Sequence, residues 1–173
     1  HGHYTEEDEP SPLTVYARTK AEAEALVLAN LLHSVVRTSL TVGKSPNGDR
    51  GIEEQLRHRW AKGDTVKLFA DEYRSPIPAE VTARATWELA LAKRPGLYHL
   101  AGSQRMSRLE IGRAIAERNP EWNPKIESCS LRDYDGPPRA ADTSLDCSKL
   151  QQLLSFPLTG LTEWLGSSAT QPA

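Results

Sequence analysis

The sequence predicts an α/β protein with at least partly parallel strands. Segments of helical composition alternate with short β-branched or apolar runs along most of the 173 residues. Helices that connect successive strands favour parallel pairing, because a parallel pair needs a crossover connection. The strand-like runs are bounded by glycine or by other turn-forming residues. The length suits one domain or one and a half, and is sufficient to bury a core.

The first element is a helix expected over residues 16–32, after an acidic, proline-containing loop at 1–15. Tyr16 and Lys20 would lie one turn apart on the same face, so a phenol and an ammonium can point into one pocket. A nearby cation stabilises a phenolate, and the positive end of the helix dipole acts in the same direction. The spacing alone is weak evidence, because a surface tyrosine beside a solvated lysine also produces it.

The middle of the chain continues the alternation. A β-branched run at 33–43 that ends in glycine predicts a buried or half-buried strand. The turn-forming residues 44–51 predict a surface loop, and a helix over 52–62 is closed by the glycine that follows it. Residues 65–70 predict a short strand, and 71–77 a loop.

A second helix–strand–helix unit follows. Residues 80–93 have helical periodicity, and 97–102 form a short apolar run that glycine ends. Ser107 and Glu110 have the spacing of a capping box, in which each side chain accepts from the backbone N–H of the other. The helix that they open is expected to end near Asn119.

The last part of the chain has weaker signals. Residues 126–130 predict an edge strand, and the proline-rich residues 136–139 an irregular, exposed connection. Two short helices are expected over 144–154 and 161–165, followed by a disordered tail at 167–173.

Composition excludes several classes of function. The formal net charge is -2 and no basic run occurs, so neither nucleic acid nor an anionic membrane is an expected partner. No apolar run approaches the roughly 20 residues that span a bilayer. We interpret Cys129 and Cys147 as reduced thiols of a cytoplasmic protein. His1 and His3 lack further ligands nearby in sequence, so we expect no metal site.

The usual start of a nucleotide-binding α/β unit is missing from these residues. Such a unit opens on an apolar strand followed by a glycine-rich turn, and no G-x-G-x-x-G or P-loop sequence occurs here. We therefore expect the chain to begin partway through a larger unit.

Several separated segments together match one family pattern. They are residues 4–10, 16–20, 36–39, 73–77, 96–102, 107–111 and 142–150. In this ordered set the chain resembles the carboxy-terminal half of an extended short-chain dehydrogenase/reductase, most closely dTDP-4-dehydrorhamnose reductases. The resemblance implies an incomplete Rossmann-type, NAD(P)-binding fold plus a small α/β substrate-binding region. Residues 1–43 would end the dinucleotide-binding domain, and 44–166 would be mainly the substrate-binding region.

The resemblance assigns roles to five residues. In such enzymes NADPH or NADH delivers hydride to the ketone carbon of a nucleotide-linked 4-keto sugar. Tyr16 would be the general acid that protonates the forming alkoxide, while Lys20 would stabilise its phenolate and bind the nicotinamide ribose; both contact the cofactor. Thr38 and Ser39 would lie beside the nicotinamide, although an ordinary strand end is the alternative. Arg74 would pair with the substrate diphosphate, although a plain surface arginine fits that position equally well.

In the family pattern, much of the cofactor site would precede His1. The glycine-rich turn, the residue that reads the adenosine ribose and the third catalytic hydroxyl all belong to that part. We therefore expect this polypeptide alone neither to bind cofactor tightly nor to turn over, and the choice between NADH and NADPH stays open.

Two other functions fit the same resemblance. One is a non-catalytic binding protein, as in the regulatory subunit of methionine adenosyltransferase, and the other is a nucleotide-sugar epimerase or dehydratase. The presence of both Tyr16 and Lys20 favours an enzyme, and the short carboxy-terminal portion favours a reductase. A homodimer is also considered, since extended reductases often pair through helices, with the Tyr16 helix as one candidate surface.

Overall fold

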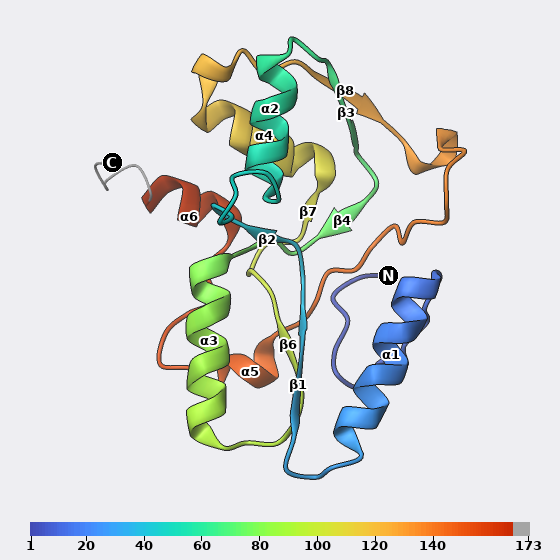
Figure 1. Ribbon diagram of the computed structural model, residues 1–173, viewed down its shortest axis with the longest axis vertical. Helices are drawn as coiled ribbons and strands as arrows, with labels where there is room; N and C mark the ends of the chain where they lie inside the picture. The colour runs from blue at the N-terminus through green and yellow to red at the C-terminus, as the bar shows by residue number, and fades with distance from the viewer. Residues whose placement is uncertain (168–173) are drawn as a thin grey trace.

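The computed structural model describes residues 1–167, and Figure 1 shows two halves stacked along the long axis. The helices are α1 (Val15–Leu28), α2 (Ile52–Ala61), α3 (Ala79–Ala92), α4 (Arg108–Arg118), α5 (Ser148–Gln151) and α6 (Leu161–Ser167). The strands are β1 (Ser34–Thr38), β2 (Thr41–Val42), β3 (Val66–Phe69), β4 (Tyr73–Arg74), β5 (Ile77–Pro78), β6 (Gly96–Leu100), β7 (Met106–Ser107) and β8 (Ile126–Cys129). Short 3-10 turns occupy Pro120–Trp122 and Leu131–Asp133.

The predicted α/β class is confirmed. Within the described residues, three of the four strand pairs are parallel, namely β1–β6, β2–β5 and β3–β8, and only β4–β7 is antiparallel. Each parallel pair joins strands that are distant in sequence, so helices lie in the connections between them. Among residues 1–167, none of the helices has the length and apolar character that crossing a membrane requires.

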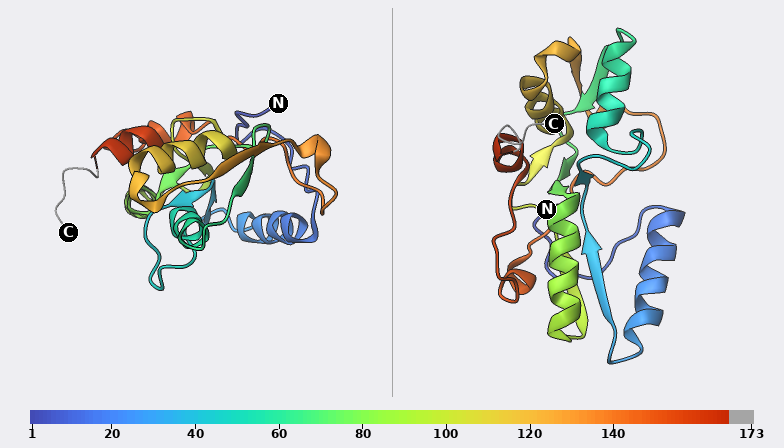
Figure 2. Two further views of the ribbon diagram at one scale, coloured as in Figure 1. Left: turned by 90° about the horizontal axis from the view of Figure 1, so that it is seen from above. Right: turned by 60° about the vertical axis from the view of Figure 1, so that its left-hand side comes forward.

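The lower half is built around the β1–β6 pair. The register runs from Ser34 opposite Gly96 to Thr38 opposite Leu100. Figures 1 and 2 show α1 on one side of this pair and α3 on the other. The buried apolar cluster of this half consists of Ile77, Ala85, Leu89, Tyr98, Leu100, Leu150 and Leu158. Because α1 has no buried residue, the core lies on the α3 side of the strands.

The upper half packs α2 and α4 against the β3–β8 pair. Its buried cluster consists of Val42, Ile52, Leu56, Trp60, Val66, Leu68, Leu109, Ile111, Ile115, Ala116, Leu161 and Leu165. Gly112 allows α4 to lie directly on β3, because a Cβ at this position would come within 2.1 Å of the Leu68 side chain. The Trp60 indole donates to the carbonyl of Lys125 at 3.2 Å, which ties α2 to the start of β8.

Several helix ends match the sequence prediction. Helix α2 ends as expected, with Gly63 in the left-handed region at φ 81°. The capping box that opens α4 is present, with Ser107 Oγ accepting from the Glu110 N–H at 3.1 Å and Glu110 Oε2 accepting from the Ser107 N–H at 2.7 Å. Cys129 and Cys147 are free thiols, as predicted, and burial raises the pKa of Cys147 to about 12.

The first predicted helix was too long at its carboxyl end. Helix α1 stops at Leu28, whereas the composition indicated residues 16–32. The Asn30 side chain accepts from the Leu32 N–H at 2.9 Å, and this local turn competes with a further helical turn.

The predicted strand at 33–43 is two strands. β1 pairs with β6 and β2 pairs with β5, so the chain changes partner between them. The predicted loop at 71–77 contains β4 and the first residue of β5. These strands are only two residues long, which is too short to leave a periodic signal in the sequence.

The helix predicted over 144–154 is also shorter, because only Ser148–Gln151 is helical. Leu145 forms a parallel bridge with Tyr4, so the preceding residues are extended along the amino-terminal segment. Ser167 is the last residue of α6, not part of a tail, and the rest of the predicted tail lies outside the described residues. The predicted division of the chain at residue 43 stays a prediction.

Glu54 anchors the loop before α2. Its carboxylate accepts from Ser45 N–H at 2.8 Å, Ser45 Oγ at 2.6 Å, Arg50 N–H at 3.0 Å and Gly51 N–H at 2.8 Å. These hydrogen bonds, the Ser45 hydroxyl first, lower the pKa of Glu54 from its ordinary 4.5 to about 2. A carboxylate with a depressed folded-state pKa stabilises the fold above its unfolded pKa, and this contribution is lost as the pH falls through the folded value.

We therefore predict that Glu54→Gln lowers the melting temperature at pH 7. The difference from wild type should shrink as the pH falls from about 4.5 to about 2, because wild-type Glu54 is then protonated as well. Thermal unfolding followed by circular dichroism across this range measures both effects. The control is Glu117→Gln on the exposed face of α4; an equal effect of the two substitutions at pH 7 contradicts the prediction.

Candidate functional site

The Tyr16–Lys20 pair lies at the amino end of α1. Thr14 caps this helix, and its hydroxyl accepts from the Ala17 N–H at 3.1 Å. Lys20 Nζ lies 5.5 Å from the centroid of the Tyr16 ring, so the pair has the one-turn spacing that the sequence predicted. Tyr16 is 72% exposed, which leaves its hydroxyl accessible to a bound molecule.

The carboxyl end of β1 is at the same end of the lower half as the start of α1. Figure 1 shows α1 and β1 antiparallel, so the helix begins where the strand ends. Thr38 is the last residue of β1 and is exposed, whereas Ser39 Oγ accepts from the Ser75 N–H at 3.0 Å. The fold therefore places the start of α1, with Tyr16 and Lys20, and the end of β1, with Thr38 and Ser39, near the middle of the molecule.

Arg74 is already held by protein groups. Its Nη2 donates to Glu72 Oε1 at 2.8 Å, and its Nη1 donates to the carbonyls of Tyr73 and of Ala140, the latter at 3.2 Å. Burial lowers the pKa of the Arg74 guanidinium. Both terminal nitrogens of this guanidinium are therefore already occupied by protein groups. The role of Arg74 in binding a diphosphate stays a prediction.

Glu72 is a buried carboxylate at the centre of a charged cluster. The residue is 1% exposed and accepts from Arg139 Nε at 2.7 Å and Arg139 Nη2 at 2.9 Å, in addition to Arg74. Its backbone carbonyl accepts from the Arg108 N–H at 2.9 Å, which fixes the amino end of α4 beside β4. Burial lowers the pKa of Arg108, whereas the hydrogen bonds that Arg139 donates to Glu72 raise the pKa of Arg139. Two guanidinium groups thus donate to one carboxylate, and the charge of Arg108 also interacts with it, so these four residues together carry excess positive charge.

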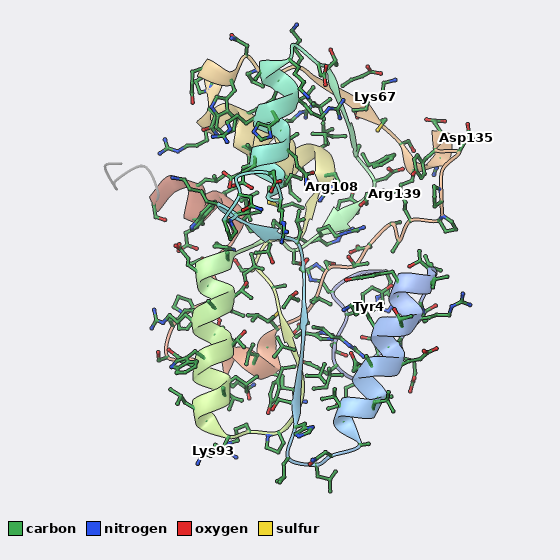
Figure 3. The ribbon with its side chains drawn as sticks, in the orientation of Figure 1. Tyr4, Lys67, Lys93, Arg108, Asp135 and Arg139 are labelled. Carbon is green, nitrogen blue, oxygen red and sulfur yellow. The ribbon has the colours of Figure 1, made fainter. Side chains whose placement is uncertain are left out.

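A cavity of about 210 Å³ lies next to this cluster, between α2, β3 and the amino end of α4. Four cationic side chains contribute to its walls, namely Arg59, Lys67, Arg108 and Arg139. Figure 3 shows Arg108 and Arg139 near β4. The other lining residues are Ile52, Gln55, Leu56, Val66, Leu68 and Phe69. Arg74 is not one of the described residues that line it.

The cavity combines cations with an aromatic wall. The Arg139 guanidinium carbon lies 5.3 Å from the Phe69 ring centroid and 5.7 Å from that of Tyr134. The two rings meet edge to face at a centroid distance of 5.4 Å. An anion with an attached planar or apolar group fits this combination, because the guanidinium groups bind the charge and the ring offers a stacking surface.

Sequence reasoning found Arg74 but missed Glu72, Arg108 and Arg139. Arg108 directly follows the capping serine, where the sequence pattern describes a helix start and gives no reason to assign a binding role. Arg139 was included in a connection that was expected to be irregular and exposed. Only the return of residues 139–142 to β4, marked by the bridge between Tyr73 and Asp142, brings these side chains together.

Comparison with known proteins identifies the family. The chain matches the RmlD substrate binding domain over residues 1–171. A probable low-salt glycan biosynthesis reductase from Haloferax volcanii is 32% identical over 87% of this chain and 51% of its own length. A dTDP-4-dehydrorhamnose reductase from Sinorhizobium fredii is 28% identical over 92% and 57%. The methionine adenosyltransferase 2 subunit beta of Rattus norvegicus is 27% identical over 87% and 47%. The chain thus spans about half the length of the curated relatives it matches.

Solved structures agree with this result. A hypothetical dTDP-4-dehydrorhamnose reductase from Sulfolobus tokodaii superimposes with a TM-score of 0.77 at 30% identity, covering 92% of this chain and 55% of that one. A dTDP-4-dehydrorhamnose reductase from Bacillus anthracis, solved in complex with NADP, gives a TM-score of 0.82 at 19% identity over 95% and 58%, which supports the shared fold. The chain therefore belongs to the RmlD substrate-binding-domain family, whose relatives include dTDP-4-dehydrorhamnose reductases, as the sequence resemblance predicted.

Proposed function

We propose that this chain is part of an NAD(P)H-dependent reductase that acts on a nucleotide-linked 4-keto sugar. The observation that carries the proposal is the Tyr16–Lys20 pair, one turn apart and solvent-accessible at the start of α1, in a chain whose relatives include reductases of this class. The proposed reaction converts a ketone to an alcohol and needs one hydride and one proton.

The proton is assigned to Tyr16. The nicotinamide cofactor supplies the hydride when bound. Tyr16 Oη donates its proton to the oxygen of the former carbonyl, where negative charge develops as the carbon is reduced. Lys20 stabilises the resulting phenolate through its ammonium charge, which lies one helical turn away. Thr38 and Ser39, at the carboxyl end of β1, are proposed to contact the nicotinamide end of the cofactor.

The substrate diphosphate is assigned to the cavity beside Glu72. The excess positive charge of Arg74, Arg108 and Arg139 over one carboxylate supports an anionic ligand. Arg108 has the greatest capacity for a new partner, because none of its described hydrogen bonds involves the guanidinium. Arg74 then acts through Glu72, by neutralising the carboxylate that holds Arg139.

Two features support a requirement for further protein in the cofactor site. Within the described residues, β1 pairs only with β6, which leaves its other edge open beside α1. On α1 the large side chains of Val15, Tyr16 and Leu26 are 66%, 72% and 79% exposed. An open strand edge and an apolar helix face are normally covered in a complete protein. The same helix face is a candidate surface for a homodimer, which stays a prediction.

A non-catalytic binding role is the second candidate function. It is favoured by the 27% identity with the methionine adenosyltransferase 2 subunit beta. The two candidates differ in turnover, because a binding subunit does not require proton donation by Tyr16. A nucleotide-sugar epimerase or dehydratase would also use the Tyr–Lys pair, but would oxidise or dehydrate a sugar, so the products distinguish it from a reductase.

We predict that Tyr16→Phe in the full-length protein lowers kcat for ketone reduction by about 10²–10⁴-fold. The dissociation constant of NADPH should stay nearly unchanged, because the substitution removes only the hydroxyl. Steady-state kinetics and fluorescence titration of NADPH measure the two quantities. Tyr98→Phe is the matched control, since within residues 1–167 the hydroxyl of Tyr98 donates a hydrogen bond to the carbonyl of Pro95, at 3.5 Å, and to no catalytic candidate. An unchanged kcat in the Tyr16 variant refutes the assigned proton donor.

We predict that Arg108→Met weakens binding of thymidine diphosphate by about tenfold or more, the effect of a lost charged hydrogen bond of about 1.5–3 kcal/mol. Isothermal titration calorimetry with the nucleotide measures the dissociation constant. Arg113→Met, on the exposed face of the same helix, is the control for nonspecific loss of charge. Equal affinities of the Arg108 variant and wild type argue against the cavity as the diphosphate site.

We predict that a polypeptide of residues 1–173 binds NADPH only weakly and does not reduce substrate. The residues contain no glycine-rich turn that would cradle the pyrophosphate. Titration of NADPH into this polypeptide, followed by an assay for substrate-dependent oxidation, tests both parts. Submillimolar binding together with turnover would show that the prediction is wrong.

A further inference from the structure

We propose that Glu24, Arg37 and His99 form a positioning chain that sets the orientation of α1, and with it the Tyr16–Lys20 pair. These residues do not touch substrate and act through the helix. The catalytic consequence rests on the proposed function, whereas the mechanical consequence concerns the structure alone and is tested separately.

Helix α1 has few other means of attachment. It contributes no buried residue, and its large apolar side chains Val15, Leu26 and Val27 are 66%, 79% and 40% exposed. Apolar packing therefore holds the helix only weakly. Among the described hydrogen bonds and ion pairs, Glu24 is the α1 side chain that reaches another element. A single side chain thus provides the polar attachment of the helix to the sheet.

The attachment is a two-point contact. Arg37 Nε donates to Glu24 Oε2 at 2.9 Å, and Arg37 Nη2 donates to Glu24 Oε1. The two side chains are 24% and 16% exposed, so the pair is largely sheltered from solvent. A planar fork on a carboxylate fixes direction as well as distance, which a single hydrogen bond does not.

His99 fixes the arginine from the other side. Arg37 Nη1 lies 3.2 Å from His99 Nε2, and an arginine can only donate, so Nε2 must be the unprotonated acceptor. The proton of the neutral ring is then on Nδ1, which donates to the carbonyl of Tyr4 at 2.9 Å. The backbone N–H of His99 donates to Glu6 Oε1 at 2.7 Å. His99 is 0% exposed, and protein groups contact both nitrogens of its ring.

The spacing along α1 connects this chain to the catalytic pair. Tyr16, Lys20 and Glu24 follow one another at intervals of four residues, so they lie along one side of the helix. A rotation of α1 about its axis would move the hydroxyl of Tyr16 and break the two-point contact of Glu24 together. Holding Glu24 in place therefore holds the direction in which Tyr16 and Lys20 point.

The mechanical test is hydrogen–deuterium exchange on the 173-residue chain. Glu24→Gln should accelerate exchange of the α1 backbone amides by about tenfold or more, because a charged, two-point contact is lost. Amides of α4 should be unchanged. Glu22→Gln, at an exposed position of the same helix, is the matched control and should change exchange by less than about twofold. Glu24→Asp, which keeps the carboxylate, should restore part of the protection. Equal exchange of α1 in wild type and Glu24→Gln overturns the proposal.

A second measurement on wild-type protein avoids any effect of a variant on folding. The ¹⁵N resonances of the imidazole should show a protonated Nδ1 and an unprotonated Nε2 for His99 at neutral pH. A protonated Nε2 would be incompatible with the arginine donor and would contradict the chain of contacts.

The catalytic test uses the full-length protein. Glu24→Gln should lower kcat by about tenfold or more, since small misplacements of a reacting group have large effects, while the KM for NADPH changes by less than about threefold. Wild-type kcat in this variant, despite faster exchange of α1, would overturn the catalytic part. If wild-type protein shows no reduction at all, the proposed function fails, and hydrogen exchange still decides the positioning role.

Discussion

The parallel pairing of β1 with β6 is the constraint on which the arrangement of the molecule depends. Two parallel neighbours cannot be joined by a tight turn, so the chain between them must leave and return at the opposite end. Here that connection contains β2, α2, β3, β4, β5 and α3, and it builds much of the upper half before it returns to the sheet. The same pairing directs the carboxyl end of β1 toward the middle of the molecule, where α1 begins. The β1–β6 pairing therefore determines where the Tyr16–Lys20 pair lies as well as how the chain reaches the arginines near Glu72.

Buried charge is the second organising feature. A carboxylate as deeply buried as that of Glu72 is tolerated only when cations and hydrogen bonds compensate for its lost hydration. Arg74 and Arg139 provide that compensation from β4 and from the segment that returns past it. The compensation exceeds one charge, since Arg108 is also close, and the surplus faces a cavity. The compensated charge around Glu72 thus creates an environment suited to an anion.

The two halves contrast in how firmly their candidate residues are held. The guanidinium groups near Glu72 rest on a buried cluster and on the capped start of α4. The Tyr–Lys helix instead lies on the outside of β1, without buried side chains, and depends on one ion pair that His99 supports. A helix attached in this way has an apolar face that further protein can cover. The same attachment explains why polar contacts, and not core packing, decide where Tyr16 points.

The sequence by itself determined the α/β class, the capped start of α4, the glycine-terminated end of α2, the family and the Tyr16–Lys20 spacing. These features depend on local propensity, on hydrogen bonds between near neighbours, or on an ordered set of motifs, and all three can be read from the amino-acid sequence. The tertiary structure alone decided the cluster around Glu72, the partners of Arg37 and the division of residues 33–43 into two strands. Each of these depends on contacts between segments far apart in the chain, such as Glu72 with Arg139 and Arg37 with His99. Local sequence patterns do not encode which distant side chain meets which, because that is fixed by how the strands pair and where the chain returns.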